Sequence, residues 1–345
     1  MKRLIIHIVL FVFVLFFIQS KGISQKTDTI FHINGNILTG DFTKMVYGVA
    51  TWKMDGMGTI SLEETKIYTI ISSKIFEIKM NSGRIYFGSF EASEKRREVN
   101  LVLVNENVLV KIEDIVEVYP IKKSFKTRLS GNFSLGANYS KGSNVATLQF
   151  SGNLDYRKRN SEWGLTWDTN DTYQADTLSA SKSDITLAWQ RTLNKGWYAD
   201  VGIGASQNLQ LGTELRWSLN FSGIKDLAYN EWNRLYAAVG INLSKEIPFG
   251  DAPTQDDIAG LFQVKWKVYK LWSPKIWVDS DIMYLPYLTD DRYRFTFNLN
   301  PKVSIFSDNF KIGFNLYYTY DSKPQTVDAS NDDYGLNLQF TYSLN

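Results

Sequence analysis

The feature that most constrains this chain is a two-residue hydrophobic alternation that persists from about residue 128 to residue 344. In the last segment, apolar side chains recur at every second position from Tyr334 to Leu344, with polar or small residues between them. Alternate residues of a strand point to opposite faces, so each segment has one face in an apolar medium. These segments are longer than the roughly 5–6 residues of a soluble strand and match the roughly 9–11 of a tilted membrane strand. Because an open sheet cannot lie in lipid, the sequence predicts a closed transmembrane antiparallel β-barrel.

We expect about twelve barrel strands, an even number that puts both ends of the barrel on the periplasmic side. Long polar connections predict external loops at Gln174–Lys182, Lys245–Asp257 and Asp321–Asp332, and residues 194–196 and 273–274 predict tight periplasmic turns. The connection Leu209–Thr213 is short for an external loop, and Ile224–Asn230 is long for a turn. Pro301 cannot donate to a ladder, so the tenth strand is expected to end there or to contain a bulge. The expected strand cores lie near residues 128–139, 145–157, 162–173, 183–193, 197–208, 214–223, 233–244, 259–271, 275–285, 292–300, 310–320 and 333–344.

The N-terminus predicts export. The chain begins Met-Lys-Arg and is apolar from Leu4 to Ile18, which is typical of a secretory signal peptide and short for a retained anchor helix, the alternative. We place the signal at residues 1–24, with cleavage after Ser24. Cysteine is absent, which excludes disulfides and thiolate metal sites, and a net charge of +2 gives no reason to expect a nucleic-acid partner.

Residues 25–120 predict a small periplasmic β-domain of two similar units. The motif Asn-Gly-Asn-Ile-Leu-Thr-Gly at 34–40 recurs as Asn-Ser-Gly-Arg-Ile-Tyr-Phe-Gly at 81–88, and both contain turn signals between strands. Each copy is followed by an Ile/Val-rich strand, expected from Ile67 to Ile71 and from Val108 to Val118. A basic linker at 121–127 joins this domain to the barrel at 128–345. A duplication of this kind more often reflects structure than a binding site.

The barrel register follows from charge, because a lysine or arginine facing lipid costs roughly 2–4 kcal/mol at mid-bilayer. A hairpin centred on Ser273 sets Lys267 opposite Asp279 and Lys265 opposite Asp281, with all four side chains facing inward. The expected lumen-lining residues are Lys265, Lys267, Asp279, Asp281, Arg292 and Arg294.

Two segments carry a family resemblance. The run from Met283 to Arg294 joins two strands, and Tyr-Thr-Tyr-Asp-Ser-Lys-Pro at 318–324 is followed by Asn-Asp-Asp-Tyr-Gly at 331–335. These segments resemble the family of salt-induced outer-membrane proteins, a domain-of-unknown-function family of β-barrels, over about residues 125–345. The motif at 34–40 is similar to the periplasmic β-domain that often precedes that barrel. The resemblance implies an outer-membrane location, with outer-membrane lipid, lipopolysaccharide and the barrel-assembly machinery as partners, and supplies no catalytic residue. The chain departs from the usual barrel terminus, because it ends on Asn345 rather than on an aromatic residue.

The residue inventory argues against an enzyme. The only histidines are His7, in the predicted signal, and His32, in the β-domain, so the barrel lacks the base of a Ser-His or Asp-His mechanism. No cofactor or metal is expected. Three carboxylate pairs, at 256–257, 290–291 and 332–333, are predicted to lie in external loops as solvated acidic residues, with calcium binding as the alternative.

Two functions remain open. The first is a narrow pore or transport-related channel with a polar, charged lumen. The alternative is a non-conducting structural or envelope-adaptation barrel whose periplasmic domain docks a protein partner. The choice depends on whether the inward side chains fill the lumen.

Overall fold

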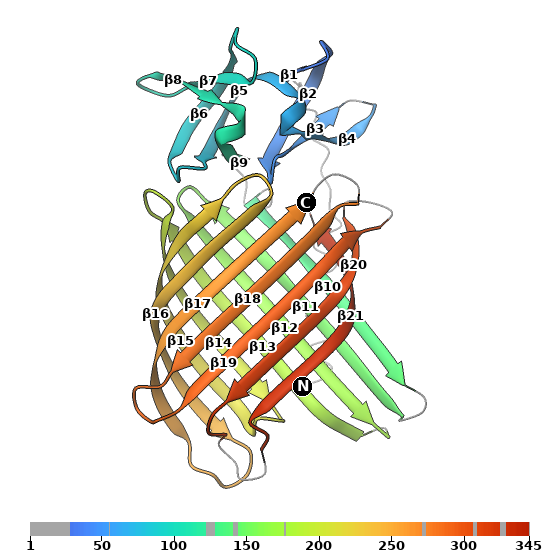
Figure 1. Cartoon of the computed structure of the whole chain (residues 1–345), viewed down its shortest axis with the longest axis vertical. Helices are drawn as coiled ribbons and strands as arrows, with labels where there is room; N and C mark the ends of the chain where they lie inside the picture. Colours follow the sequence, from blue (N-terminus) through green and yellow to red (C-terminus); the bar gives the residue numbers. More distant parts are fainter. Residues whose placement is uncertain are drawn as a thin grey trace.

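The chain forms a nine-stranded β-domain and a closed barrel of twelve strands, joined end to end (Figure 1). The computed structural model describes residues 28–54, 56–121, 128–140, 144–175, 177–270, 274–305, 309–324 and 329–344. The predicted signal peptide at 1–24 and linker residues 122–127 lie outside the described residues. We call the barrel mouth that faces the β-domain the near mouth, and the opposite one the far mouth.

The β-domain sheet has the order β4-β3-β2-β1-β5-β6-β7-β8, and β9 pairs with both β2 and β5. Two short 3-10 helices, η1 (Glu64–Lys66) and η2 (Ile112–Asp114), precede β5 and β9. The strands are β1 (Asp28–His32), β2 (Ile37–Val46), β3 (Val49–Met54), β4 (Gly58–Glu63), β5 (Ile67–Met80), β6 (Ile85–Ala92), β7 (Glu98–Val102), β8 (Asn107–Lys111) and β9 (Ile115–Pro120).

The internal repeat has a backbone explanation. Gly35 and Gly83 both adopt a positive φ at the turns that precede β2 and β6. Gly40 and Gly88 lie in those strands where a Cβ would come within 2.6 and 2.4 Å of a neighbouring carbonyl oxygen, so only glycine fits. The expected continuous strand from Val108 to Val118 is wrong, because η2 separates β8 from β9. The helices η1 and η2 therefore hold equivalent places in the two units.

The barrel strands pair in chain order, and β10 closes the ring on β21 with Gly131 opposite Leu344. The twelve strands expected from the sequence are confirmed. They are β10 (Leu129–Ser140), β11 (Val145–Lys158), β12 (Ser161–Gln174), β13 (Thr177–Thr192), β14 (Trp197–Asn208), β15 (Thr213–Tyr229), β16 (Asn233–Pro248), β17 (Gln255–Lys270), β18 (Ile276–Pro286), β19 (Tyr293–Ser304), β20 (Phe310–Asp321) and β21 (Asp332–Leu344).

Several connections differ from expectation. The long loop predicted at Gln174–Lys182 is wrong, since β13 already begins at Thr177. The segment Ile224–Asn230 is not a long turn, because β15 continues to Tyr229 and β16 begins at Asn233. In both cases polar residues that resembled a loop belong to strands that extend beyond the apolar band, where polar side chains meet water. The connections 249–254 and 322–331 stay the longer ones, and both lie at the far mouth.

Pro301 neither ends its strand nor creates a bulge, contrary to expectation. β19 continues to Ser304, and its register with β18 is unbroken, with Val278 opposite Pro301. On the other side, the ladder to β20 is interrupted between Leu299 and Lys302 and resumes in the same register. Asn315 Nδ2 donates to Asn300 Oδ1 at 2.6 Å across this gap. A side-chain hydrogen bond thus joins the strands where proline has no N–H to donate.

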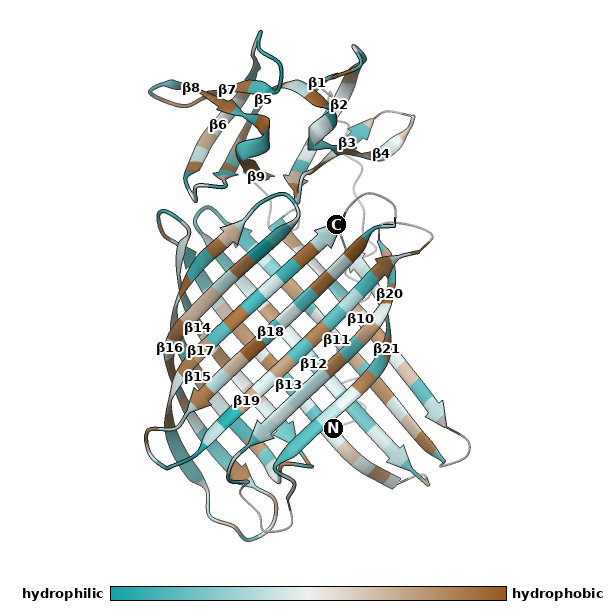
Figure 2. Ribbon diagram, viewed as in Figure 1, coloured by the Kyte–Doolittle hydropathy of each residue, from teal (hydrophilic) through white to brown (hydrophobic). Residues whose placement is uncertain are grey.

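The outer wall of the barrel is apolar. Hydrophobic and hydrophilic residues alternate along the barrel strands (Figure 2). On β17 the outward residues Phe262, Val264 and Trp266 are 42–48% exposed, whereas Gln263, Lys265 and Lys267 lie on the opposite face. A water-soluble protein rarely exposes a continuous apolar surface of this extent. The wall therefore matches the lipid-facing band of a transmembrane barrel. Trp163 and Trp197, near strand ends at the near mouth, are exposed as expected of an aromatic girdle.

Candidate functional site

The middle of the lumen carries the charged hairpin expected from the sequence. β17 and β18 pair with Lys265 opposite Asp281 and Lys267 opposite Asp279, which is the predicted register. Lys265 Nζ lies 3.7 Å from Asp281 Oδ2, and the two side chains keep 37% and 23% of their surface accessible to solvent. Gln263 Nε2 also donates to Asp281 at 2.8 Å. These charges line a part of the interior that water can reach.

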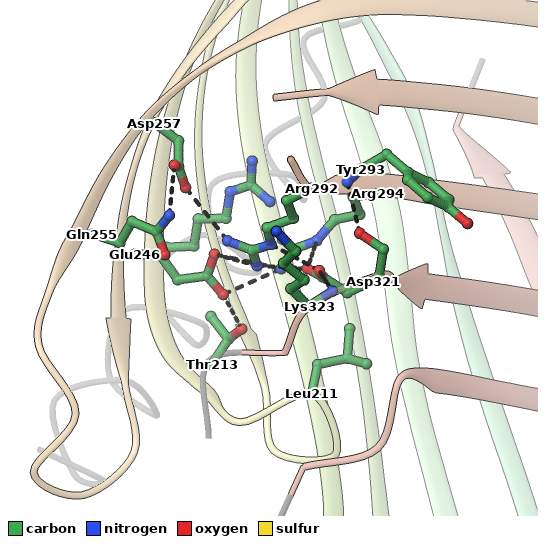
Figure 3. A network of polar contacts seen from close by, with 12 residues as sticks. Leu211, Thr213, Glu246, Gln255, Asp257, Arg292, Tyr293, Arg294, Asp321 and Lys323 are labelled. Carbon is green, nitrogen blue, oxygen red and sulfur yellow. Dashed lines mark hydrogen bonds and ion pairs between the residues drawn. The ribbon is translucent and has the colours of Figure 1, made fainter. Parts of the chain in front are cut away.

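A buried ion network centred on Arg292 lies at the far mouth (Figure 3). Arg292 lies just before β19, and its guanidinium contacts carboxylates from three other strands. Its Nη2 lies 2.5 Å from Asp321 and 3.0 Å from Glu246, and its Nη1 lies 3.4 Å from Asp257. All four side chains are at most 1% exposed. Such a network links β16, β17 and β20 across the interior, and removing one member leaves buried charges without a partner.

Arg294 forms a second layer beneath Arg292. Its Nη2 lies 2.7 Å from Asp321 and 3.2 Å from Glu246. Thr213, at the start of β15, donates to the same glutamate at 2.5 Å. The structure thus separates the six predicted lumen residues along the barrel. Lys265 and Asp281 line the accessible middle, and Lys267 and Asp279 lie nearer the near mouth, where Lys267 is opposite Arg234. Arg292 and Arg294 are buried in the far-mouth network.

The prediction that the carboxylate pairs are solvated loop residues is wrong for two of them. Asp257 lies in β17, is buried, and contacts Arg292. Asp333 lies in β21, is also buried, and accepts a hydrogen bond from Asn208 at 2.9 Å. Alternation explains the error, because in each pair one residue points outward and its neighbour points into the lumen. Asp290, in the third pair, does lie in a connection, where it contacts Lys323 at 3.2 Å.

The near mouth is covered by the β-domain through a second set of buried charges. Lys79 of β5 lies 2.9 Å from Asp226 and donates to the hydroxyl of Tyr198, both from the barrel. Arg234 of β16 reaches the same Asp226 at 2.8 Å. The ring of Tyr229 lies 4.3 Å below the Lys79 ammonium group, close enough for a cation–π contact. The contact is therefore a specific interface between the two parts.

Alternation on β5 and β9 explains how the β-domain can have a core and a docking face at once. Ile78 and Val118 point into the domain's apolar core, whereas their neighbours Lys79 and Glu117 point to the barrel. The hydroxyl of Tyr229 donates to Glu117. Further contacts join Arg157 to Glu77 at 2.7 Å and to Glu117 at 3.8 Å, and the rings of Tyr47 and Tyr269, whose centroids are 3.5 Å apart.

Glu117 is the most strongly perturbed acid of this interface. Its burial would raise the pKa of the carboxyl group, but the charges of Lys79, Arg157 and Arg234 and the hydrogen bond from Tyr229 lower it to about 2. Two of these cations and the tyrosine belong to the barrel. The carboxylate is therefore stabilised by docking.

Of the acidic partners at the two mouths, only Asp257 belongs to a carboxylate pair that the sequence marks out. Glu246 and Asp321 fall within the predicted external loops Lys245–Asp257 and Asp321–Asp332, and no role was predicted for Lys79 or Glu117. Alternation along a strand can show which face a residue lies on, but it cannot identify the residue that it contacts on a distant strand. Among the described residues, no group of three or more His, Asp or Glu side chains could hold a metal ion. No helix among these residues is long and apolar enough to cross a membrane.

Comparison with known proteins extends these observations. A search of the curated proteins gave no match. Among solved structures, the NanC porin is 9% identical and aligns over 62% of this chain and 99% of its own, with a TM-score of 0.37. A second porin is 9% identical and aligns over 78% of this chain and 97% of its own, with a TM-score of 0.30. The structure of the Beta Domain of the Bordetella autotransporter BrkA is 9% identical and aligns over 62% of this chain and 97% of its own, with a TM-score of 0.27. At these identities the likeness concerns the fold alone.

The family is shown by a separate comparison, which confirms the resemblance to a barrel family of unknown function. Residues 125–344 match one family over more than half of the chain, from the linker to the end of β21. The chain therefore belongs to the family described as Protein of unknown function, DUF481.

Proposed function

We propose that this protein is an outer-membrane barrel that acts as a narrow pore, closed at both mouths in its resting state. The observation that carries the proposal is the accessible charge between the two closures. Lys265 and Asp281 stay partly exposed in the middle of the lumen, whereas Arg292, Glu246 and Asp321 at the far mouth are at most 1% exposed. An interior built only as packing would bury its ion pairs throughout.

The proposed orientation follows from the ends of the barrel. β10 begins and β21 ends at the near mouth, as both ends of a bacterial barrel do on the periplasmic side. The near mouth then faces the periplasm, and the β-domain lies there. The far mouth, with the longer connections 249–254 and 322–331, faces the outside. Outer-membrane lipid and lipopolysaccharide surround the apolar wall, and the barrel-assembly machinery inserts it.

The alternative is a non-conducting structural barrel with the β-domain as a docking module for a periplasmic protein. It is favoured by the two sets of buried ion pairs, which join strands at the far mouth and the β-domain to the barrel at the near mouth. The two functions differ in whether a conducting path exists once both closures are removed.

Single-channel recording in planar bilayers tests the proposal. We expect the mature wild-type chain to be silent or to open rarely, because the proposed resting state is closed at both mouths. A combined variant, Lys79→Met with Arg157→Met and Arg292→Met, removes contacts at both mouths and should give a steady, small ion current. Arg191→Gln, an outward-facing arginine near a strand end, is the matched control and should behave as wild type. A correctly folded combined variant that never conducts would reject the pore and support the structural barrel.

A further inference from the structure

The seam that closes the barrel, between β10 and β21, is paired over only part of its length. The ladder runs from Gly131 opposite Leu344 to Gly136 opposite Gln339, and all of it lies toward the near mouth. Among the described residues, no pairing joins the far half of these two strands, which part toward the far mouth (Figure 1). The ring is therefore closed by the near half of this seam.

The gap does not arise because either strand stops. β10 stays paired with β11 as far as Ser140, and β21 is paired with β20 from Asp332 onward. The register of the seam, if continued, would place Asn138 of β10 opposite Asn337 of β21. Both strands are thus regular, and in the described part of the far half each leaves one backbone edge without a strand partner.

Side-chain exposure differs between the two halves of the seam. In the paired half the inward Ser134, Gln339 and Thr341 are each 2% exposed, and the hydroxyls of Ser134 and Thr341 lie 2.7 Å apart. In the unpaired half Asn138, which also points inward, is exposed. The outward Tyr139 beside it is 64% exposed, compared with 42–48% for the outward residues of β17. The gap therefore opens the interior to the surroundings of the barrel.

The opening lies at the level of the apolar wall. On β11 the outward neighbour of Ala137 is Leu148, which is 53% exposed, and on β20 the outward neighbour of Leu338 is Phe314, which is 50% exposed. The gap thus has an apolar wall around it and the polar lumen behind it. Backbone N–H and C=O groups without a partner are costly in hydrocarbon and are tolerated only beside protein or water. The two free edges therefore need a polar neighbour at this depth.

We propose that the far half of the β10–β21 seam is a lateral portal that admits a membrane lipid, with its polar head in the lumen and its acyl chains in the bilayer. The head group supplies the polar neighbour that the free backbone edges need, and the exposed amide of Asn138 lies on the lumen side to meet it. An amphiphile suits the gap because one side of it is polar and the other apolar. The inference goes beyond the proposed pore and does not depend on conduction.

Engineered disulfides measure the gap, and the absence of native cysteine gives them a clean background. Asn138→Cys with Asn337→Cys spans the unpaired half, and Ser134→Cys with Thr341→Cys is the matched control in the paired half. After oxidation of the mature protein in vesicles, we expect the control pair to cross-link and the portal pair to stay reduced. Cysteines whose Cα atoms are more than about 7 Å apart cannot be bridged without backbone movement. Equal cross-linking of the two pairs would show a closed seam and overturn the portal.

A fluorophore on a single cysteine tests the occupant, and this readout stands even if a double variant fails to fold. The vesicles are phosphatidylcholine containing phosphatidylcholine with a nitroxide quencher on its acyl chain. A label at Asn138→Cys should be quenched severalfold more than one at Thr186→Cys, which points inward on β13 between the outward Ile185 and Leu187. Leu148→Cys, on the outer wall, gives the signal of full contact with acyl chains.

Two results of this experiment count against the portal. Quenching at Asn138→Cys no stronger than at Thr186→Cys would mean that lipid does not enter the gap. An intermolecular disulfide formed through Asn138→Cys would mean that a second copy of the chain covers the seam in place of lipid. A silent bilayer recording would reject the pore and leave both of these measurements unaffected.

Discussion

The β-domain and the barrel both alternate apolar and polar residues along their strands, but the interior of the β-domain is apolar and that of the barrel is mostly polar. The largest fully buried side chains all belong to the β-domain and are apolar, led by Trp52, Phe42, Phe76 and Phe90. The most buried barrel residues include Asp321, Glu246 and Thr213, while most apolar barrel residues face outward. The exception is a small buried cluster that includes Ala259, Leu261 and Leu285. Alternation therefore specifies that a strand has two unlike faces, and the medium outside decides which face becomes the interior.

At the interface, the outward polar face of the β-domain meets the inward polar face of the barrel. On the β-domain side, Lys79 and Glu117 are the outward, polar residues of strands that face an apolar core. On the barrel side, Asp226, Arg157 and Arg234 are inward residues at the near mouth. Each set would be hydrated alone, and docking buries them against each other. Substitutions in either interior, and at the interface between them, can break or sharpen this contrast.

The largest effect is expected from Arg292→Met. Removing one partner of a buried ion network costs about 3–5 kcal/mol, because Glu246, Asp257 and Asp321 lose a cation that they share. The free energy of unfolding from guanidinium titrations in detergent should fall by this amount. Arg191→Met on the outer wall serves as the control and should change it little. Equal stabilities for the two variants would mean that the polar interior contributes no more than the surface.

The corresponding change in the β-domain is Ile78→Ala, which should destabilise that domain by about 2–5 kcal/mol through lost burial and a cavity. Hydrogen exchange should show faster exchange in β5 and β9 and unchanged protection in β12 and β13. Ile185→Ala, at an outward position 49% exposed, is the matched control in the barrel. Loss of protection throughout the barrel would show that the two parts unfold as one unit.

Docking of the β-domain should weaken in acid. The pKa of Glu117 is about 2 when docked, against an ordinary value of 4.5, so its contribution to docking is complete above about pH 4.5 and is lost as the pH falls toward 2. Limited proteolysis of the interface by pepsin between pH 4.5 and 2.5 should reveal this change. Glu117→Gln should dock more weakly at pH 7 and lose the pH dependence. If the wild-type interface were equally protected from pepsin at both pH values, the stabilisation of docking by ionised Glu117 would be contradicted.

The smallest effect is expected at the hairpin in the middle of the lumen. Lys265→Ala should lower the free energy of unfolding by only about 0.2–1 kcal/mol, because this pair is partly solvated. The double exchange Lys265→Asp with Asp281→Lys should restore most of the loss, as measured by the same guanidinium titration. A loss as large as that of Arg292→Met would indicate that the middle of the lumen is packed rather than water-accessible.

The three sets of variants test different regions along the proposed pore. Arg292→Met probes the far mouth, Glu117→Gln probes the near mouth, and the Lys265 variants probe the space between them. A molecule in which all three have large and equal effects would behave as a filled barrel.

Much of the barrel could be predicted because alternation and charge are local signals. The number of strands and the pairing of Lys265 with Asp281 follow from segment length, phase and the position of one turn. The same reasoning failed at Gln174–Lys182 and Ile224–Asn230, where strands continue beyond the membrane band and lose their apolar signature. It also failed at Pro301, because the missing N–H is tolerated where Asn315 and Asn300 join the strands through their side chains.

The sequence by itself determined which residues face inward, because period-two phase is a property of consecutive residues. It also determined that the barrel interior would be polar and the outside apolar. Only the tertiary structure decided which inward residues meet, since the curvature of the ring brings Arg292, just before β19, to Glu246 of β16 and Asp321 of β20. The docking of Lys79 against Asp226 was likewise decided in three dimensions, because no local pattern encodes the partner of a charge 147 residues away.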